Sequence, residues 1–228
     1  MNSFKKTAAG LIMAGLSSTA WAQGSTELGP ATLLSDLIAN DGTILVGDKL
    51  FSDFTYLATG DMPSDTAVNV VPIIDNLGNF GLRFQGGFID LPGDNASDAL
   101  ITYNITVTDP NFAIIGARMQ GNVAMITQGA PDSIATVTDT FLAEVTDQNL
   151  VIFDNGVVLD LDDSVFFEDS FTVLNAQKDI LLLTGGDDVA TTLSFVDQTY
   201  YQIPEPTSLA LLGLGGLLLT RRRRDRIA

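Results

Sequence analysis

The chain has 228 residues and a formal net charge of −17, and it contains neither cysteine nor histidine. Without cysteine there are no disulfides, thiolate nucleophiles or thiolate metal sites, and without histidine the usual general base and the commonest zinc ligand are missing. The excess of acidic residues disfavours binding to nucleic acid or to an anionic lipid surface.

The N-terminus has the three parts of a secretory signal peptide. Two lysines precede an uncharged run over residues 8–20, and small residues, Ala20 and Ala22, stand before Gln23. As a helix the run is about 20 Å long, too short for a bilayer core of about 30 Å. We therefore predict that residues 1–22 engage a Sec-type export machinery and are removed by signal peptidase before Gln23.

Residues 23–203 are predicted to form one acidic passenger domain, with 26 acidic and four basic residues. Apolar and polar residues alternate from Leu100 to Thr108, which is typical of a strand with one buried face. Further strands are predicted at 43–46, 50–58, 68–74, 80–89, 113–119, 123–127, 134–145, 171–174, 180–183 and 191–196. Turn residues recur between these runs, and this pattern predicts an all-β fold, an antiparallel β-sandwich that is jelly-roll-like or related.

Two local patterns make more specific predictions. Asn155-Gly156 separates the apolar runs 151–154 and 157–159, and both turn residues tolerate positive φ, which predicts a hairpin with a two-residue loop. Residues 31–39 place four aliphatic side chains on one side of a helix, which predicts one short helix near the N-terminus.

An acidic cluster follows the predicted hairpin. Asp160, Asp162 and Asp163 offer hard oxygen ligands on a turn, which suits calcium chemically. The spacing lacks the glycine and the bidentate glutamate of an EF-hand loop. Both interpretations, a calcium site and solvated turn carboxylates, remain open, and we expect no other cofactor.

The C-terminus has three parts in a fixed order. Pro204, Glu205 and Pro206 come first, an uncharged stretch rich in leucine and glycine follows over 207–220, and the basic tail 221–228 ends the chain. As a helix the uncharged stretch is about 21 Å long, which crosses a bilayer only with thinning or snorkelling side chains. The four consecutive basic residues of the tail are Arg221, Arg222, Arg223 and Arg224. They hold it in the cytoplasm by the positive-inside rule, so the main domain lies outside.

This order of parts resembles the PEP-CTERM sorting signal, over about 25 of the 228 residues. The resemblance implies processing by an exosortase, a membrane enzyme of bacteria that produce exopolysaccharide. Residues 204–228 would then be the sorting signal, with the motif Pro204-Glu205-Pro206 recognised and a transmembrane sorting helix docked in the membrane. We also expect the two prolines to keep the junction extended and separate from any final strand.

The sequence therefore favours a non-catalytic protein of the cell surface or of an exopolysaccharide-associated (biofilm) matrix. It would be held in the inner membrane during transit, with its domain outside the cytoplasm. A calcium-assisted carbohydrate-binding module is the first alternative. A glycoside hydrolase that uses a carboxylate pair is the second, because acidic side chains alone can carry that chemistry. No motif for an enzyme is present.

Overall fold

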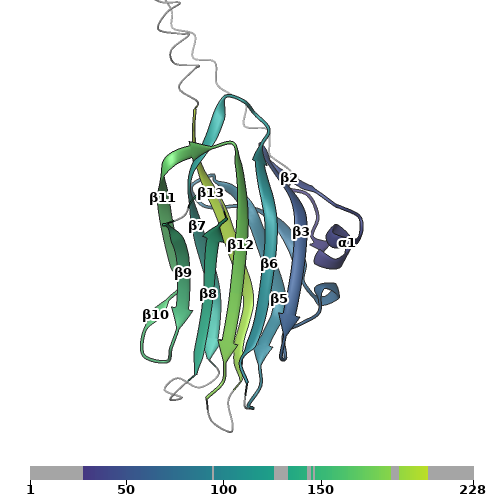
Figure 1. Cartoon of the computed structure of the whole chain (residues 1–228), viewed down its shortest axis with the longest axis vertical. Coiled ribbons are helices and arrows are strands. Elements are labelled where there is room, and N and C mark those ends of the chain that lie inside the picture. Colours follow the sequence, from purple (N-terminus) through teal and green to yellow (C-terminus); the bar gives the residue numbers. More distant parts are fainter. Residues whose placement is uncertain are drawn as a thin grey trace, which may run out of the picture.

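Two antiparallel sheets face each other in the computed structural model (Figure 1). The structure describes residues 28–93, 95–125, 133–142, 145, 147–185 and 190–204. Every strand pair within these residues is antiparallel, as Figure 1 shows for both layers. The predicted antiparallel β-sandwich is therefore confirmed.

The strand order in each sheet mixes segments that are distant in the sequence. The six-stranded sheet has the order β1 (Thr32–Leu33), β4 (Asn69–Ile74), β5 (Phe80–Asp90), β13 (Thr191–Pro204), β7 (Phe112–Met125) and β11 (Asp162–Phe171). The seven-stranded sheet has the order β10 (Leu159–Asp160), β9 (Asn149–Asp154), β8 (Ile134–Phe141), β12 (Val173–Leu183), β6 (Ser97–Val107), β3 (Lys49–Thr59) and β2 (Ile44–Val46). A short helix, α1 (Leu34–Ala39), and a 3₁₀ turn, η1 (Asp65–Ala67), lie beside the sheets.

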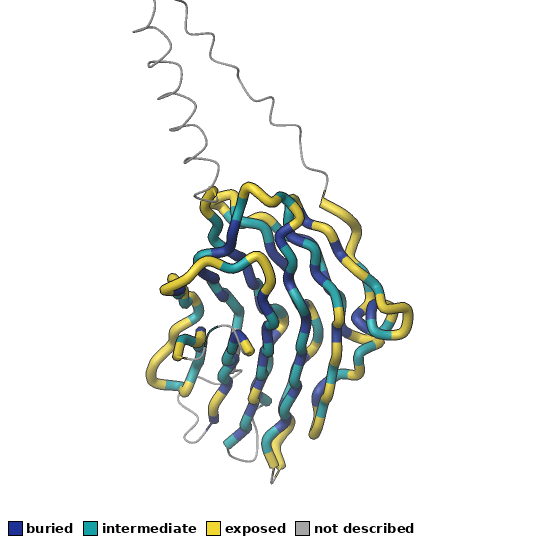
Figure 2. Tube along the Cα trace, turned by 45° about the horizontal axis from the view of Figure 1, so that its top comes forward, coloured by how far each residue is buried: buried dark blue, intermediate teal, exposed yellow. Residues whose placement is uncertain are grey.

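The core lies between the two sheets and is rich in aromatic side chains. In β6 every second residue is buried, which is the alternation that Figure 2 shows along the central strands. The rings of Phe51, Phe84 and Tyr103 are fully or almost fully buried and touch one another around Tyr103. Burial of each such side chain stabilises the fold by about 1.5–3 kcal/mol. Tyr103 is thus part of the core, as the alternation from Leu100 to Thr108 predicts for one face of this strand.

Two local predictions need correction. The hairpin between β9 and β10 exists, but its loop covers residues 155–158 instead of two. The carboxamide of Asn155 accepts hydrogen bonds from the amides of Val157 and Val158, and Asp154 accepts one from the amide of Gly156. These side-chain bonds stabilise a wider turn. The predicted helix begins at Leu34, because the residues before it pair with β4 as β1.

The final strand contradicts another expectation. β13 runs to Pro204, whose Cα is paired with that of Phe112 in β7. The first proline of the sorting motif is thus the last residue of the sheet, and the junction is not separate from the final strand. Proline is tolerated there because it ends the strand, where its missing N–H removes no later ladder bond.

The rest of the sorting signal, including the predicted sorting helix, lies outside the described residues. Within those residues, no helix is long and apolar enough to cross a membrane.

Candidate functional site

A row of polar side chains crosses the outer face of the six-stranded sheet. Arg83 of β5, Asp197 of β13, Gln120 of β7 and Asp162 of β11 are consecutive cross-strand neighbours in the sheet register. The residues on either side of Arg83 are fully buried, so alternation turns Arg83 away from the core. Four segments far apart in the sequence therefore bring hydrogen-bonding groups into one line.

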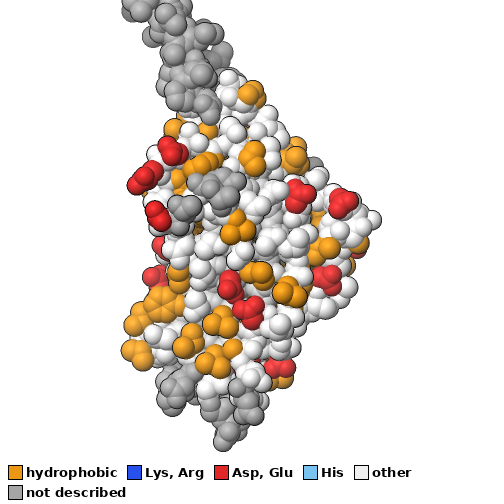
Figure 3. Space-filling model, in the orientation of Figure 1, with side chains coloured by type: hydrophobic (Ala, Val, Ile, Leu, Met, Phe, Trp, Pro, Cys, Tyr) orange, Lys and Arg blue, Asp and Glu red, His pale blue; other side chains and the backbone are white. Residues whose placement is uncertain are grey.

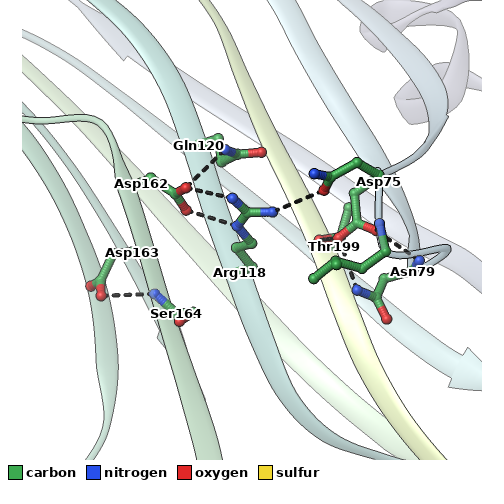
Figure 4. Close-up of polar contacts among 10 residues, drawn as sticks. Asp75, Asn79, Arg118, Gln120, Asp162, Asp163, Ser164 and Thr199 are labelled. Atoms are coloured by element: carbon green, nitrogen blue, oxygen red, sulfur yellow. Dashed lines mark hydrogen bonds and ion pairs between the residues drawn. The ribbon is translucent and has the colours of Figure 1, made fainter.

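The two arginines of this face are each held by a carboxylate. Arg83 donates from Nε and Nη2 to both oxygens of Asp197, at 2.6 and 2.8 Å. Arg118 donates in the same two-point manner to Asp162, which also accepts a hydrogen bond from Gln120 at 3.0 Å (Figure 4). Such paired bonds fix the planes of both groups. Arg118 lowers the pKa of Asp162, which keeps that carboxylate charged.

The carboxylate of Asp75 lies across β13 from the pair formed by Arg118 and Asp162 (Figure 4). Asp75 accepts hydrogen bonds from the side chain and the amide of Asn79, from the amide of Leu77 and from the hydroxyl of Thr199 (Figure 4). Burial disfavours its charged form, but these hydrogen bonds outweigh burial and lower the pKa of Asp75. The group is therefore a fixed hydrogen-bond acceptor at neutral pH.

These side chains surround a hollow of about 250 Å³ on the sheet surface. It is lined by Ile73, Ile74, Asp75, Asn76, Arg83, Arg118, Gln120, Asp197 and Thr199. Aromatic rings flank it along the strands. Phe166 of β11 stacks on Tyr201 of β13 with their centroids 4.8 Å apart, and 61% of Phe166 is exposed. At the other end, Arg83 lies over the ring of Phe195 at 4.1 Å.

The hollow offers binding chemistry. Arginine and glutamine N–H groups donate, and carboxylate and amide oxygens accept, so the lining complements a ligand that is rich in hydroxyl groups. The exposed face of Phe166 adds an apolar platform beside these polar groups. Sequence reasoning missed this site because a single sequence does not show that Arg83 and Asp197 are neighbours across two strands. One sequence feature could have pointed to the site: the acidic domain has only four basic residues, and two of them, Arg83 and Arg118, lie here.

All four basic residues of the domain lie within the described residues, and each makes an ion pair. The partners are Asp48 for Lys49, Asp197 for Arg83, Asp162 for Arg118 and Asp139 for Lys178. The face formed by the seven-stranded sheet shows acidic and apolar side chains, and no lysine or arginine is visible among its described residues (Figure 3). The remaining negative charge is therefore screened mainly by water and dissolved ions.

The three residues of the predicted calcium site lie where the chain passes from β10 into β11. Asp160 ends β10, and Asp162 and Asp163 begin β11, so the last two are strand residues and not turn residues. Asp162 binds Arg118, whereas Asp163 accepts hydrogen bonds from the amides of Val151 and Ser164. Within the described residues no three acidic side chains are grouped so that they could hold a metal ion. The calcium site stays a prediction.

A pair of carboxyl groups occupies the outer face of the seven-stranded sheet. Asp179 of β12 and Asp98 of β6 lie on adjacent strands, with Asp179 paired to Leu100 and Asp98 to Leu181. Burial, a hydrogen bond with Asp98 and repulsion from its charge raise the pKa of Asp179 to about 6. The folded state therefore favours the protonated acid, and this contribution to stability is lost as the pH rises through about 6.

We expect the substitution Asp179→Asn to flatten the pH dependence of stability. The unfolded chain binds this proton only below its ordinary pKa of 3.8, so the wild-type Tm should fall between about pH 4 and pH 7 more steeply than the variant Tm. Asp169→Asn removes one exposed charge from β11 and is the matched control. Thermal melts across this range test the expectation, and parallel Tm curves for wild type and Asp179→Asn would contradict it.

Of the residues predicted for the two export signals, only Pro204 lies within the described part of the chain. Pro204 ends β13, whereas Ala20, Ala22, Gln23, Glu205, Pro206 and the four tail arginines lie outside the described residues. Signal-peptide cleavage therefore stays a prediction.

Comparison with known proteins identifies the C-terminal signal. Residues 202–224 match the PEP-CTERM protein-sorting motif. The chain thus carries a PEP-CTERM sorting signal, as the order of its three parts predicted. This motif implies export, processing by an exosortase and sorting to the cell surface. No curated protein sequence matches the chain.

Two solved structures resemble the chain at low similarity. One is TmCBM61 in complex with β-1,4-galactotriose, with 10% identity over 66% of this chain and 88% of that chain, and a TM-score of 0.27. The other is the enzymatically active domain of tailspike protein 4 from bacteriophage CBA120, with 11% identity over 65% of this chain and 19% of that chain, and a TM-score of 0.28. These likenesses concern architecture alone.

Proposed function

We propose that this chain is an exported, non-catalytic protein of the cell surface or extracellular matrix, which contributes a rigid β-sandwich to an exopolysaccharide-associated layer. The observation that carries the proposal is the continuity of domain and signal. The sorting motif begins at residue 202, and the final strand β13 ends at Pro204, so three residues belong to both. Before processing, the domain therefore stands directly at the membrane, without a spacer.

The absence of histidine and cysteine from the chain supports a non-catalytic role. The carboxyl groups of Asp98 and Asp179 lie on adjacent strands, close enough that Asp98 raises the pKa of Asp179. Glycoside hydrolases instead hold their two carboxyl groups about 5 Å or more apart, which leaves room for the sugar. This pair is therefore unsuited to the hydrolase alternative.

Replacing Pro204, Glu205 and Pro206 together by alanine tests the proposed sorting. We expect the variant to accumulate in the membrane fraction with its C-terminal segment attached, because the processing enzyme no longer recognises it. Immunoblots of membrane, surface and medium fractions measure this distribution. Pro92→Ala, in an exposed loop of the domain, is the matched control and should behave as wild type. Normal release of the triple variant would contradict the proposal.

The hollow on the six-stranded sheet favours a second function, binding of a polysaccharide chain. Its fixed donors and acceptors suit sugar hydroxyl groups, and the exposed ring of Phe166 suits the apolar face of a sugar. The lining carries the two arginines and the carboxylates of Asp75 and Asp197, so its charge is balanced. Neutral chains therefore fit it better than strongly acidic ones.

The substitution Phe166→Ala should weaken polysaccharide binding roughly five-fold in Kd, because a stacked ring contributes about 1 kcal/mol. Isothermal titration calorimetry with fractions of the host polysaccharide measures the loss. Leu57→Ala removes an exposed apolar side chain from the other sheet and is the control. Titrations with and without calcium separate the calcium-assisted alternative. Absence of binding heat for the wild type would overturn this second function and leave the sorting proposal intact.

A further inference from the structure

Both lysines of the passenger domain lie inside the sandwich. Lys49 begins β3 and Lys178 lies within β12, and neither side chain is exposed at all. Lysine normally keeps its ammonium group in water, so two fully enclosed lysines are unusual in a domain that has no others.

Each lysine reaches across the core to a glutamine of β13 and also meets an aspartate. Lys178 Nζ donates to Gln198 Oε1 at 2.9 Å and lies 3.5 Å from Asp139 Oδ2. Lys49 Nζ donates to Gln202 Oε1 and to Asp48 Oδ1. Because β3 and β12 belong to the seven-stranded sheet and β13 to the six-stranded sheet, both contacts join the two layers.

The groups around Lys178 are incompletely satisfied. Neither oxygen of Asp139 nor the Nε2 of Gln198 has a hydrogen-bond partner. The side chains of Lys178, Asp139 and Gln198 are all fully buried. Burial lowers the pKa of Lys178 and raises the pKa of Asp139 to about 6. Burial thus shifts the proton equilibrium of Lys178 toward the uncharged amine, the nucleophilic form, and the carboxyl group of Asp139 beside it can exchange protons.

We propose that Lys178 and Gln198 form an intramolecular amide bond, with Asp139 as the proton-transfer group. The lone pair of Lys178 Nζ attacks Cδ of Gln198, and a new C–N bond forms. The bond from Cδ to Nε2 breaks. Asp139 takes one proton from Nζ and passes one to Nε2, which leaves as ammonia. One amide is exchanged for another, so no oxidant, reductant or external energy source is required.

The geometry supports this direction of reaction. Lys178 Nζ already contacts the Gln198 carboxamide at Oε1, and the leaving group, Nε2, is held by no hydrogen bond. Groups that the fold holds in contact react as if at very high concentration. Ammonia is small and leaves the core, which makes the step irreversible. The bond closes a covalent loop from Lys178 in β12 to Gln198 in β13. Such a cross-link can stabilise a chain that has no cysteine and therefore no disulfide.

The second lysine provides an internal comparison. Asp48 precedes Lys49 directly in the sequence and is 15% exposed, whereas Asp139 is fully enclosed. Asp48 Oδ1 already accepts a hydrogen bond from Lys49 Nζ at 2.6 Å, whereas both oxygens of Asp139 lack such a bond and are available for proton transfer. We therefore assign the amide bond to Lys178 alone.

Mass spectrometry of the protein isolated from the producing cells tests the bond. Trypsin does not cleave after a lysine whose amine is acylated. We expect one tryptic peptide that runs from Met119 through Lys178 and Gln198, with a mass lower by one ammonia. Two separate peptides of full mass, one ending at Lys178 and the next beginning at Asp179, would overturn the proposal. This readout is needed because Gln23, the predicted mature N-terminus, loses an ammonia of its own when it cyclises.

Two variants sharpen the assignment. Gln198→Met removes the electrophile, so cleavage after Lys178 should be restored at full peptide mass. Lys49→Arg should leave the linked peptide unchanged. A loss of ammonia that persists in the Gln198→Met peptide would overturn the assignment to Gln198. The wild-type measurement stands even where a variant folds poorly, so the proposal remains testable without them.

Discussion

The substitution Gly81→Ala is expected to lower the free energy of unfolding by more than about 4 kcal/mol. Gly81 lies in β5, next to β13 in the middle of the six-stranded sheet. A Cβ atom there would lie 1.8 Å from the carbonyl oxygen of Gln198, a backbone atom that cannot turn aside. Domains are stable by only about 5–15 kcal/mol, so the variant should be largely unfolded or insoluble.

Gly87→Ala is the matched control for this prediction. Gly87 lies in the same strand, and a Cβ atom there would meet nothing within 4 Å. Its effect should stay within about 1 kcal/mol. Denaturation followed by far-UV circular dichroism measures both variants, since the only tryptophan of the chain, Trp21, lies in the predicted signal peptide. Equal stability of the two variants would contradict the close strand packing at Gly81.

Replacing Arg221, Arg222, Arg223 and Arg224 by serine should abolish retention in the membrane. Each arginine costs about 2.5–3.5 kcal/mol at the centre of a bilayer, so the cluster opposes passage of the tail. Without it, the whole chain should cross and be recovered outside the membrane with residues 207–228 attached. Fractionation followed by mass spectrometry of the C-terminal peptide measures this result.

The corresponding lysine variant keeps four positive charges and should be retained and processed as the wild type is. Normal processing of the serine variant would show that the basic tail has no role in stopping transfer.

The strands that sequence reasoning found are those with one clearly apolar face. β6 alternates along its whole length and was predicted nearly to its ends. β11 was missed because this edge strand exposes six of its ten residues, including Asp162 and Phe166. β12 was divided into two strands because Lys178 interrupts its apolar run. In the fold Lys178 points inward and is paired with Asp139, a neighbour on β8 that the sequence alone does not reveal.

The same limit applies to the candidate sites. The sorting motif was predictable because its parts are contiguous in the sequence and match a known signal at residues 202–224. The hollow depends on Arg83, Arg118 and Asp197, which come from three different strands. Its assembly requires the strand order β5-β13-β7, which local periodicity does not specify.

The central claim is that a β-sandwich is exported and then sorted through its C-terminal signal. Intact mass spectrometry of the protein recovered from the cell surface and from the medium tests this claim most directly. We predict a chain that begins at Gln23 and lacks the segment from residue 207 onward. A chain that still contains residues 209–226 in its final location would contradict the account and indicate a permanent tail anchor.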